Sequence, residues 1–250
     1  MNAFDKLARA AVILCLCVVV LGAWVRLTDA GLGCPDWPGC YGELLVPEDP
    51  AAAAAWPERP LETGKAWREM IHRYAAGTLG LLVLALALIA WRRRGEPGQP
   101  VALPTFLLGL IVFQAMLGMW TVTLLLKPLV VLLHLLGGMT TLAILFWLAR
   151  SPAPSGPPAD TGLRRFALTG LVVLALQIAL GGWVSTNYAA LACPDFPTCQ
   201  GSLWPTMDLY TGFDPWHGIG IDYEGGILDN AARVAIHFVH RLGAIVTAVV

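Results

Sequence analysis

The chain has 250 residues, of which 57% are hydrophobic and only 13% charged, with a formal net charge of −1 and a mean hydropathy of +0.66. A soluble domain carries about 25% charged residues, and this chain is too apolar to stay disordered. The absence of net basic charge excludes a DNA- or RNA-binding protein, because phosphate binding needs basic surface. The long apolar stretches are continuous rather than alternating, which excludes a transmembrane β-barrel and predicts an all-α membrane protein.

Six apolar stretches are each close to the ~20 residues that cross the hydrocarbon core of a bilayer. We expect membrane spans at residues 7–25, 67–91, 101–126, 128–148, 166–184 and 231–250. Lys6 and Arg9 precede the first stretch, as they would in a signal peptide. No small-residue cleavage site follows it, so we interpret it as a span.

The basic residues near the span ends predict the orientation in the membrane. Eight of the sixteen Lys and Arg residues fall on one side of the predicted spans: Lys6, Arg9, Arg92, Arg93, Arg94, Arg150, Arg164 and Arg165. The loop 185–232 contains no Lys or Arg. We therefore expect a cytoplasmic N-terminus and place the loops 26–66 and 185–232 on the outer, periplasmic side. No transit-peptide pattern precedes the first span, which favours a bacterial inner membrane.

The chain contains an internal repeat. Segment 22–42 recurs as segment 181–201 with 11 of 21 positions identical, and Ile71-His72-Arg73 recurs as Val239-His240-Arg241. A tandem duplication of a four-span unit explains both matches and relates the two units in parallel. We expect an N-terminal four-helix half at 1–150, a cytoplasmic linker rich in Pro, Ser and Gly at 151–162, and a second half at 163–250.

The second half lacks counterparts of the third and fourth spans of the first half. From this symmetry we expect two pseudo-symmetric four-helix bundles with about eight spans in total, of which six are present here. The duplication then predicts that about 70 further residues, with two spans and one more histidine, belong to the second bundle.

Three histidines lie within predicted spans: His72, His134 and His240. Ionisable residues in a membrane are costly and usually functional, although a single histidine can simply bond a backbone carbonyl. His72 and His134 lie at similar depth on different spans, which suits bis-imidazole ligation of a haem iron, with a zinc or copper site as the alternative. Arg73 and Arg241 follow two of these histidines and suit haem propionates. Any haem would be bound non-covalently, because the chain has no Cys-x-x-Cys-His motif.

Glu69 lies three residues before His72, on the same helix face. It suits an acid–base or charge-stabilising group beside a ligand, or an ordinary solvated residue in the first turn of a helix. His237 occupies the position of Glu69 in the second half. The two halves therefore differ in chemistry, and His237 competes with His240 as a ligand.

The predicted outer loops each carry a pair of cysteines, Cys34 with Cys40 and Cys193 with Cys199. An oxidising compartment favours a disulfide in each loop. Each bridge would stabilise its loop by about 2 kcal/mol. The spacing leaves open whether the pairs are structural staples or take part in redox chemistry.

Taken together, these motifs resemble the haem A synthase family. The resemblance rests on Cys-Pro-Asp-Trp-Pro-Gly-Cys at 34–40, Glu-Met-Ile-His-Arg at 69–73, His134, Cys-Pro-Asp-Phe-Pro-Thr-Cys at 193–199 and Ile-His-Phe-Val-His-Arg at 236–241. It covers essentially the whole chain. The family has eight spans in two four-helix halves and oxidises the C8 methyl of haem O to a formyl group, giving haem A for cytochrome c oxidase.

The resemblance also implies roles for individual residues. His72 and His134 would hold the iron of the substrate haem O, and His240 would ligate a haem B cofactor. Glu69 matches the acidic residue that the family requires for catalysis. Cys34 and Cys40 match an outer-loop pair proposed to aid electron transfer or haem handling.

The resemblance implies haem O synthase as a partner, together with an electron donor that the sequence does not identify. A homo-oligomer stays open. Two other functions fit parts of the pattern: a di-haem b-type electron-transfer cytochrome and a membrane thiol–disulfide oxidoreductase. The exchange of Glu69 for His237 between the halves argues against two equivalent electron carriers, and the thiol reading leaves the histidines unexplained.

Overall fold

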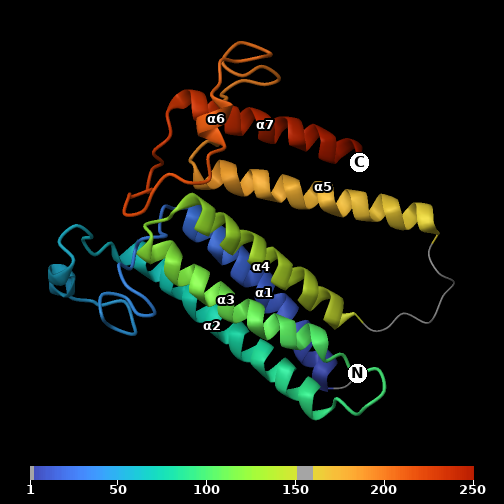
Figure 1. The fold of residues 1–250 in the computed structure, drawn as a ribbon. Helices are drawn as coiled ribbons and strands as arrows, with labels where there is room; N and C mark the ends of the chain where they lie inside the picture. The colour runs from blue at the N-terminus through green and yellow to red at the C-terminus, as the bar shows by residue number, and fades with distance from the viewer. Residues whose placement is uncertain (1–2, 151–159) are drawn as a thin grey trace. The chain divides into compact units, whose positions relative to one another are not determined.

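A computed structural model describes residues 3–150 and 160–250 (Figure 1). Its long helices are α1 (Ala3–Leu27), α2 (Thr63–Arg92), α3 (Ala102–Thr123), α4 (Pro128–Ala149), α5 (Thr161–Thr186) and α7 (Asn230–Val249). Two short elements, the 3-10 helix η1 (Pro50–Ala55) and α6 (Leu209–Gly212), lie in the long loops. No strand is formed in the described residues, so the predicted all-α class is confirmed.

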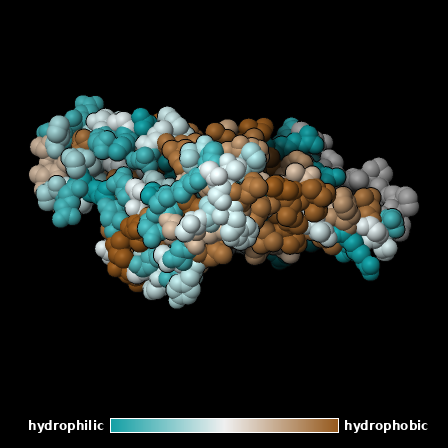
Figure 2. Space-filling model, turned by 90° about the horizontal axis from the view of Figure 1, so that it is seen from above, coloured by the Kyte–Doolittle hydropathy of each residue, from teal (hydrophilic) through white to brown (hydrophobic). Residues whose placement is uncertain are grey.

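All six long helices are long and apolar enough to cross a membrane, which confirms the six predicted spans. Many of their large hydrophobic side chains face outward, as Leu171, Val172 and Leu176 do on α5. Figure 2 shows such hydrophobic surface gathered in broad patches on the visible face. Outward-facing apolar side chains on helices of this length are typical of membrane spans, whose backbone satisfies its own hydrogen bonds. The chain is a multi-pass membrane protein.

The contacts divide the chain into two compact units. Of the described residues, the first comprises 3–126 and 137–150, and the second 127–136 and 160–250. This division differs from the sequence-based halves at residues 127–136. They contain the start of α4 and belong to the second unit, although the sequence-based first half includes them. The predicted boundaries at 150 and 163 stay a prediction, and most of the predicted linker, residues 151–159, lies outside the described residues.

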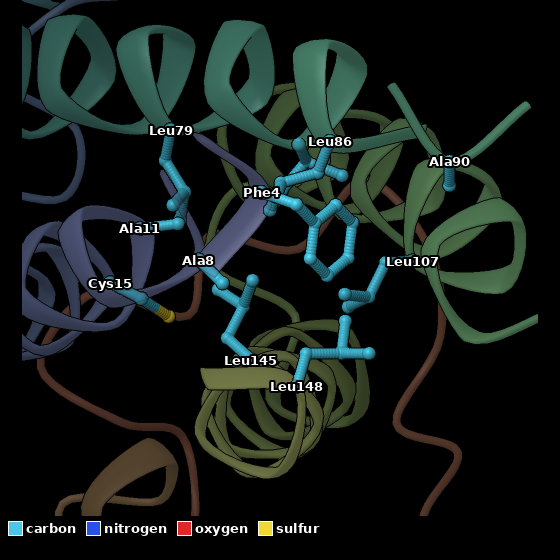
Figure 3. Packing of buried hydrophobic residues seen from close by; sticks show 11 residues of the cluster. Phe4, Ala8, Ala11, Cys15, Leu79, Leu86, Ala90, Leu107, Leu145 and Leu148 are labelled. Atoms are coloured by element: carbon cyan, nitrogen blue, oxygen red, sulfur yellow. The ribbon is translucent and has the colours of Figure 1, made fainter. Parts of the chain in front are cut away.

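The first unit is built around one apolar cluster between its helices (Figure 3). The α1 side of this cluster combines Phe4 with small residues, such as Ala8 and Ala11, which are fully buried. Larger side chains from the other helices fill the space that they leave: Leu79 and Leu86 from α2, Leu107 from α3, and Leu145 and Leu148 from α4. Small residues permit close helix approach where the hydrophobic effect cannot drive association within lipid.

The second unit packs α7 against α5 and α6. Trp183 of α5 is buried against Ala232 and Ile236 of α7. Its indole Nε1 donates a hydrogen bond of 2.8 Å to the Gly212 carbonyl at the end of α6. This contact ties the long second loop to α5. At the start of α7, Asp229 caps the helix by accepting from the Ala232 N–H at 2.8 Å.

The internal repeat reappears in how two helices end. After α1, Asp29 adopts a left-handed conformation (φ 46°), and the Ala30 N–H bonds the Val25 carbonyl at 2.9 Å. After α5, Tyr188 does the same (φ 53°), and the Ala189 N–H bonds the Val184 carbonyl at 2.9 Å. Left-handed C-terminal caps of this kind redirect the chain sharply. Each cysteine loop is thereby turned back over the next span of its own unit.

Candidate active site

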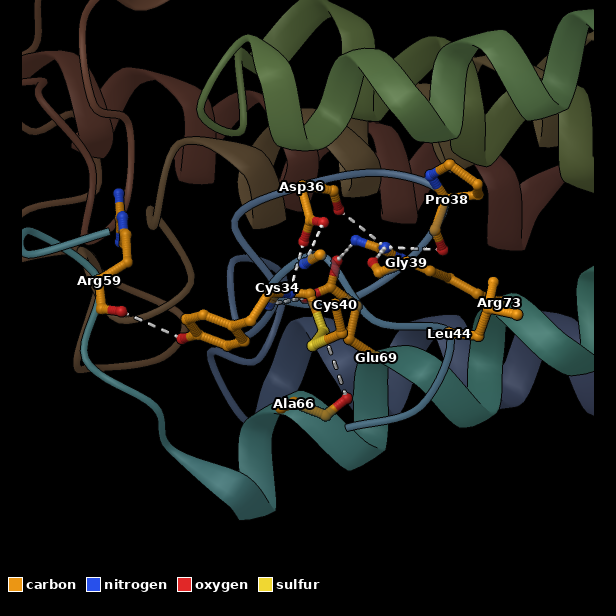
Figure 4. The surroundings of a disulfide bond; sticks show 12 residues. Cys34, Asp36, Pro38, Gly39, Cys40, Leu44, Arg59, Ala66, Glu69 and Arg73 are labelled. Carbon is orange, nitrogen blue, oxygen red and sulfur yellow. Dashed lines mark hydrogen bonds and ion pairs between the residues drawn. A yellow bond between two sulfur atoms is a disulfide. The ribbon is translucent and has the colours of Figure 1, made fainter. Parts of the chain in front are cut away.

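The first cysteine loop is closed by a disulfide between Cys34 and Cys40 (Figure 4). Between the two cysteines, the carboxylate of Asp36 accepts the N–H groups of Tyr41 and Gly42 at 2.7 and 2.8 Å. These two residues have left-handed φ values of 53° and 80°, so their N–H groups converge on one anion. The loop therefore has a rigid shape of its own before it meets a helix.

Arg73 of α2 fastens this loop to the span. Its Nη1 donates to the carbonyls of Asp36, Pro38 and Gly39 at 2.9, 3.2 and 2.5 Å (Figure 4). Its Nη2 donates to Oε1 of Glu69 at 2.5 Å. The planar guanidinium has five N–H donors in a fixed geometry and can reach several acceptors at once. Arg73 thus holds the loop through its backbone carbonyls and pairs with the carboxylate of Glu69 on its own helix.

Glu69 is buried, with 4% of its surface exposed. Its second oxygen, Oε2, accepts the N–H of Cys34 at 2.9 Å. A buried carboxylate is stable only when it is paired and hydrogen-bonded, and Arg73 and Cys34 together meet both conditions. The alternative reading of Glu69 as a solvated first-turn residue is wrong, because the cysteine loop covers it.

His72 lies three residues after Glu69 on α2, and its side chain is partly buried. Its ring lies against Gly22 of α1, where a Cβ would come within 3.0 Å of Cε1. The ring also lies within hydrogen-bonding reach of the Val18 backbone. Nδ1 of His72 is buried and has no hydrogen-bond partner within the described residues. Gly22 therefore makes room for the imidazole ring, one nitrogen of which has no protein partner in the described chain.

The second cysteine loop repeats this construction. A disulfide joins Cys193 to Cys199, and Asp195 accepts the N–H groups of Gln200 and Gly201 at 2.6 and 3.0 Å. The Thr198 hydroxyl also donates to Asp195. These hydrogen bonds, that of Thr198 first, hold the pKa of the Asp195 carboxyl below its usual value.

Arg241 of α7 takes the place of Arg73. It donates to the carbonyls of Cys193, Asp195 and Thr198 at 2.8, 2.7 and 2.9 Å. Both arginines therefore bind loop carbonyls within their own unit. Their predicted role toward haem propionates stays a prediction.

His237 stands where Glu69 stands in the first unit, and it makes the matching contacts. Its Nδ1 lies 3.3 Å from the Cys193 N–H nitrogen and 3.0 Å from the Ala189 carbonyl, and its Nε2 accepts from Nε of Arg241 at 3.1 Å. Both ring nitrogens are thus engaged with the protein. Because His237 is bound to the loop and to Arg241 through both ring nitrogens, His240 is the better candidate of the two for binding a metal.

His240 lies against Gly181 of α5, where a Cβ would come within 3.2 Å of the ring. Its Nδ1 lies 3.1 Å from the amide Nε2 of Gln177. No described residue bonds its Nε2. Sequence reasoning did not single out Gln177, because the repeated segments begin only at residue 181. It also passed over Gly22 and Gly181, although both are identical positions of the repeat.

His134 lies on α4, in the segment 127–136 that belongs to the second unit. The pairing of His134 with His72 therefore stays a prediction. Across residues 3–150 and 160–250, no three His, Cys, Asp or Glu side chains gather closely enough to hold a metal ion between them. The described geometry thus offers no support to the alternative zinc or copper site.

The four loop cysteines are buried. Cys34, Cys40 and Cys199 have no exposed surface, and Cys193 is 4% exposed. Thiol–disulfide exchange needs an attacking thiolate to reach a sulfur atom. Burial therefore supports a structural role for both bridges and weakens the oxidoreductase alternative.

Comparison with known proteins identifies the family. The chain matches COX15-CtaA, described as cytochrome oxidase assembly protein, over residues 6–250. It belongs to the COX15-CtaA family. The match spans both cysteine loops and both arginine contacts, so the repeated architecture described above is that of a COX15-CtaA protein.

Several curated relatives carry the name haem A synthase. The chain is 46% identical to the protein from Shewanella oneidensis over 250 residues, which is 97% of this chain and 75% of that relative. It is 30% identical to the protein from Halalkalibacterium halodurans, covering 81% of this chain and 66% of the relative. A protein from Agrobacterium fabrum is also 30% identical, over 94% of this chain and 68% of its own length. The chain thus spans between two thirds and three quarters of these relatives.

Proposed function

We propose that this chain acts as a haem A synthase, which oxidises the C8 methyl of haem O to a formyl group. Its family and the names of its relatives support this function. The observation that carries it in the structure is Glu69, a buried carboxylate held by Cys34 and Arg73 one helical turn from His72. A positioned carboxylate beside an imidazole is the arrangement that acid–base chemistry near a bound substrate needs.

In this proposal haem O binds the first half through its iron, with His72 and His134 as ligands. Gly22 gives the ring of His72 its place beside α1, because a Cβ there would meet the ring, and Nδ1 has no hydrogen-bond partner in the described chain. Glu69 lies three residues away on the same face of α2. The substrate edge that reacts would lie next to its carboxylate.

The donor set of the second half fits a haem B cofactor. His240 has one ring nitrogen held by Gln177, and no described residue bonds the other. The unbonded Nε2 is the nitrogen that a haem iron would take. His240 would supply a nitrogen ligand to its iron, and the haem would supply electron transfer when bound. His237 is tied to Arg241 and the loop, as Glu69 is tied in the first half.

The reaction removes hydrogen from an unactivated methyl group and replaces it with oxygen. Two successive oxidations pass through an alcohol and a hydrated aldehyde, which loses water to give the formyl group. The protein's share is to fix the ring, exclude water and manage protons. Glu69 can accept or return a proton during these steps, or stabilise positive charge that develops beside it, while Arg73 holds its oxygens in place.

The proposal also includes the orientation of the chain in the membrane and the proteins that work with it. Both cysteine loops lie on the periplasmic side of a bacterial inner membrane, and the N-terminus is cytoplasmic, as the distribution of basic residues predicts. The oxidising periplasm is the compartment in which both disulfides persist. Haem O synthase would deliver the substrate, and an electron donor would complete the cycle.

Haem extraction tests the function. The protein is expressed with haem O synthase, and its haems are identified by chromatography and mass. We expect haem A in the wild type, and in Glu69→Ala we expect haem O without haem A but with haem B retained. A wild type that holds only haem B despite available haem O would contradict the proposal and favour a b-type electron-transfer cytochrome.

A further inference from the structure

A basic residue lies seven positions before each of the three span histidines. The pairs are Lys65 with His72 on α2, Lys127 with His134 at the start of α4, and Arg233 with His240 on α7. Seven residues of an α-helix make just under two turns and rise about 10 Å, so each basic residue shares a helix face with its histidine. In the proposed orientation, all three basic residues lie on the outer side of the histidines.

The structure gives these three cations different partners. Nζ of Lys65 lies 3.0 Å from Oε1 of Glu62. Nζ of Lys127 lies 3.3 Å from the centre of the Trp216 ring, a cation–π contact to a lysine that is only 4% exposed. Arg233 has neither kind of partner. Within residues 3–150 and 160–250 its side chain makes no ion pair, hydrogen bond or ring contact, and its Nε is buried.

The internal repeat shows which partner Arg233 lacks. The interval that separates the two His-Arg motifs also separates Lys65 from Arg233. By the same interval, the counterpart of Glu62 is Asn230. The second unit thus has the cation but an uncharged amide in place of the carboxylate. Glu62 and Asn230 are both exposed, so packing does not require this difference.

The neighbouring acid on α7 does not replace the missing carboxylate. Asp229 lies four residues before Arg233, but its Oδ1 accepts the Ala232 N–H at 2.8 Å as the cap of the helix. A partly buried charge lowers stability unless it is paired. A neutral side chain of similar length would avoid that cost. The guanidinium is therefore best explained by an anion that a ligand brings to it.

We propose that Arg233 binds a propionate carboxylate of the haem in the second half, and that Asn230 leaves its guanidinium unpaired for this purpose. The inference rests on the proposed haem B site. A haem carries two propionates on one edge of its ring, and a guanidinium can bind a carboxylate through two parallel hydrogen bonds. Arg241, for which the sequence predicts this role, already donates to three loop carbonyls.

The difference between the units then matches what each half does with its haem. In the first half, a propionate of the substrate must compete with Glu62 for Lys65, which favours release of the product. In the second half, no carboxylate of the described chain competes for Arg233. The cofactor is therefore held more firmly than the substrate, although both sites come from one duplicated unit.

Transfer of haem B to excess apomyoglobin tests the inference on the purified, haem-loaded protein in detergent. Arg233→Met removes the charge and keeps an unbranched side chain. We expect haem B to dissociate about 10–100-fold faster, the scale of a hydrogen bond to a charged group. Arg233→Lys should give an intermediate rate. Lys65→Met is the matched control from the first unit and should leave the dissociation of haem B unchanged.

The dimethyl ester of haem B separates the charge contact from packing. The ester keeps the iron and the ring but lacks both carboxylate charges. The wild type should release the ester faster than haem B, whereas Arg233→Met should release the two at similar rates. If Arg233→Met accelerates the release of both haems by the same factor, Arg233 is a packing residue and the inference is wrong.

Asn230→Glu restores the pair of the first unit. A glutamate in the first turn of a helix is favourable, so the variant should fold. We expect haem B to dissociate about 2–5-fold faster, the scale of an exposed ion pair. Asn230→Gln adds the length without the charge and should leave the rate unchanged. Equal rates for Asn230→Glu and Asn230→Gln would contradict the part assigned to Asn230.

Failure of the inference can be told apart from failure of the proposed function. If Arg233→Met leaves the haem B dissociation rate and the preference over the ester unchanged, Arg233 does not bind a propionate and the haem B site stands. If the wild type binds no haem B, the second site itself is wrong and the inference fails with it.

Discussion

The two cysteine loops share one scaffold and differ at one chemical position. In each, an aspartate inside the disulfide gathers backbone N–H groups, and an arginine one turn beyond the divergent residue binds the loop carbonyls. The divergent residue is Glu69 in the first unit and His237 in the second. Both accept a hydrogen bond from that arginine, Glu69 through Oε1 and His237 through Nε2.

The comparison separates the part of the repeat that shapes the loop from the part that can do chemistry. The arginine contacts to backbone carbonyls depend on the shape of the loop and hardly on which side chains the loop carries. They are therefore present in both units. The acceptor beside them needs only a lone pair for its structural task. A carboxylate and an imidazole both meet that need, so this position could diverge in chemistry without loss of the fold.

Exchanging the divergent residues gives the largest expected effect. Glu69→His should keep an acceptor for Arg73 but remove the carboxylate, and haem A formation should fall by about 10²–10⁴-fold, the range of general acid–base catalysis. His237→Glu should leave most haem A formation intact. The ratio of haem O to haem A in membranes that contain haem O synthase measures both. Undiminished haem A in Glu69→His would show that the carboxylate is dispensable.

Removing the arginines should affect stability unequally. Arg73→Ala leaves the Glu69 carboxylate buried without its ion pair, which costs about 3–5 kcal/mol. Arg241→Ala leaves only neutral acceptors unpaired, which costs about 1–3 kcal/mol. Unfolding by SDS in mixed micelles, followed by tryptophan fluorescence, gives both free energies. Equal losses would mean that the ion pair adds nothing to the contacts with the loop carbonyls.

Removing either disulfide should cost about the same. Both bridges join cysteines six positions apart, and chain entropy predicts a loss of about 2 kcal/mol for each. We compare Cys34→Ser/Cys40→Ser with Cys193→Ser/Cys199→Ser in the same unfolding assay, and measure haem A alongside. Haem A formation should persist in both. Its abolition only in the first double variant, at equal stability, would instead indicate redox chemistry at Cys34 and Cys40.

Acid should loosen the second loop by a small amount. The folded pKa of Asp195 is lowered, chiefly by the Thr198 hydroxyl, so its contribution is present above the unfolded value of about 3.9 and is lost as pH falls through the folded pKa. The rate at which a phosphine reduces Cys193–Cys199 measures the opening of the loop. The wild-type rate should approach that of Asp195→Asn only below about pH 4. A constant ratio of the two rates across this range would contradict the assignment.

Much of this protein follows from its sequence. The six spans could be predicted because transfer into lipid depends on each apolar stretch by itself. The duplication, the paired cysteines and the position of Glu69 next to His72 were also visible, since they are matters of spacing along one chain. The same spacing placed Glu69 and His237 at equivalent positions and so predicted that the units differ.

Only the tertiary structure decided what those residues contact. Arg73 and Arg241 bind backbone carbonyls, which every residue carries and which therefore leave no sequence signal. The choice between His237 and His240 depends on which ring nitrogens the loop occupies, and that requires the loop to be folded over α7. Gln177 meets His240 across 63 positions of sequence, because two helices pack side by side. Spacing along the chain reveals a repeat, whereas the partner of a buried polar atom is set by packing between segments.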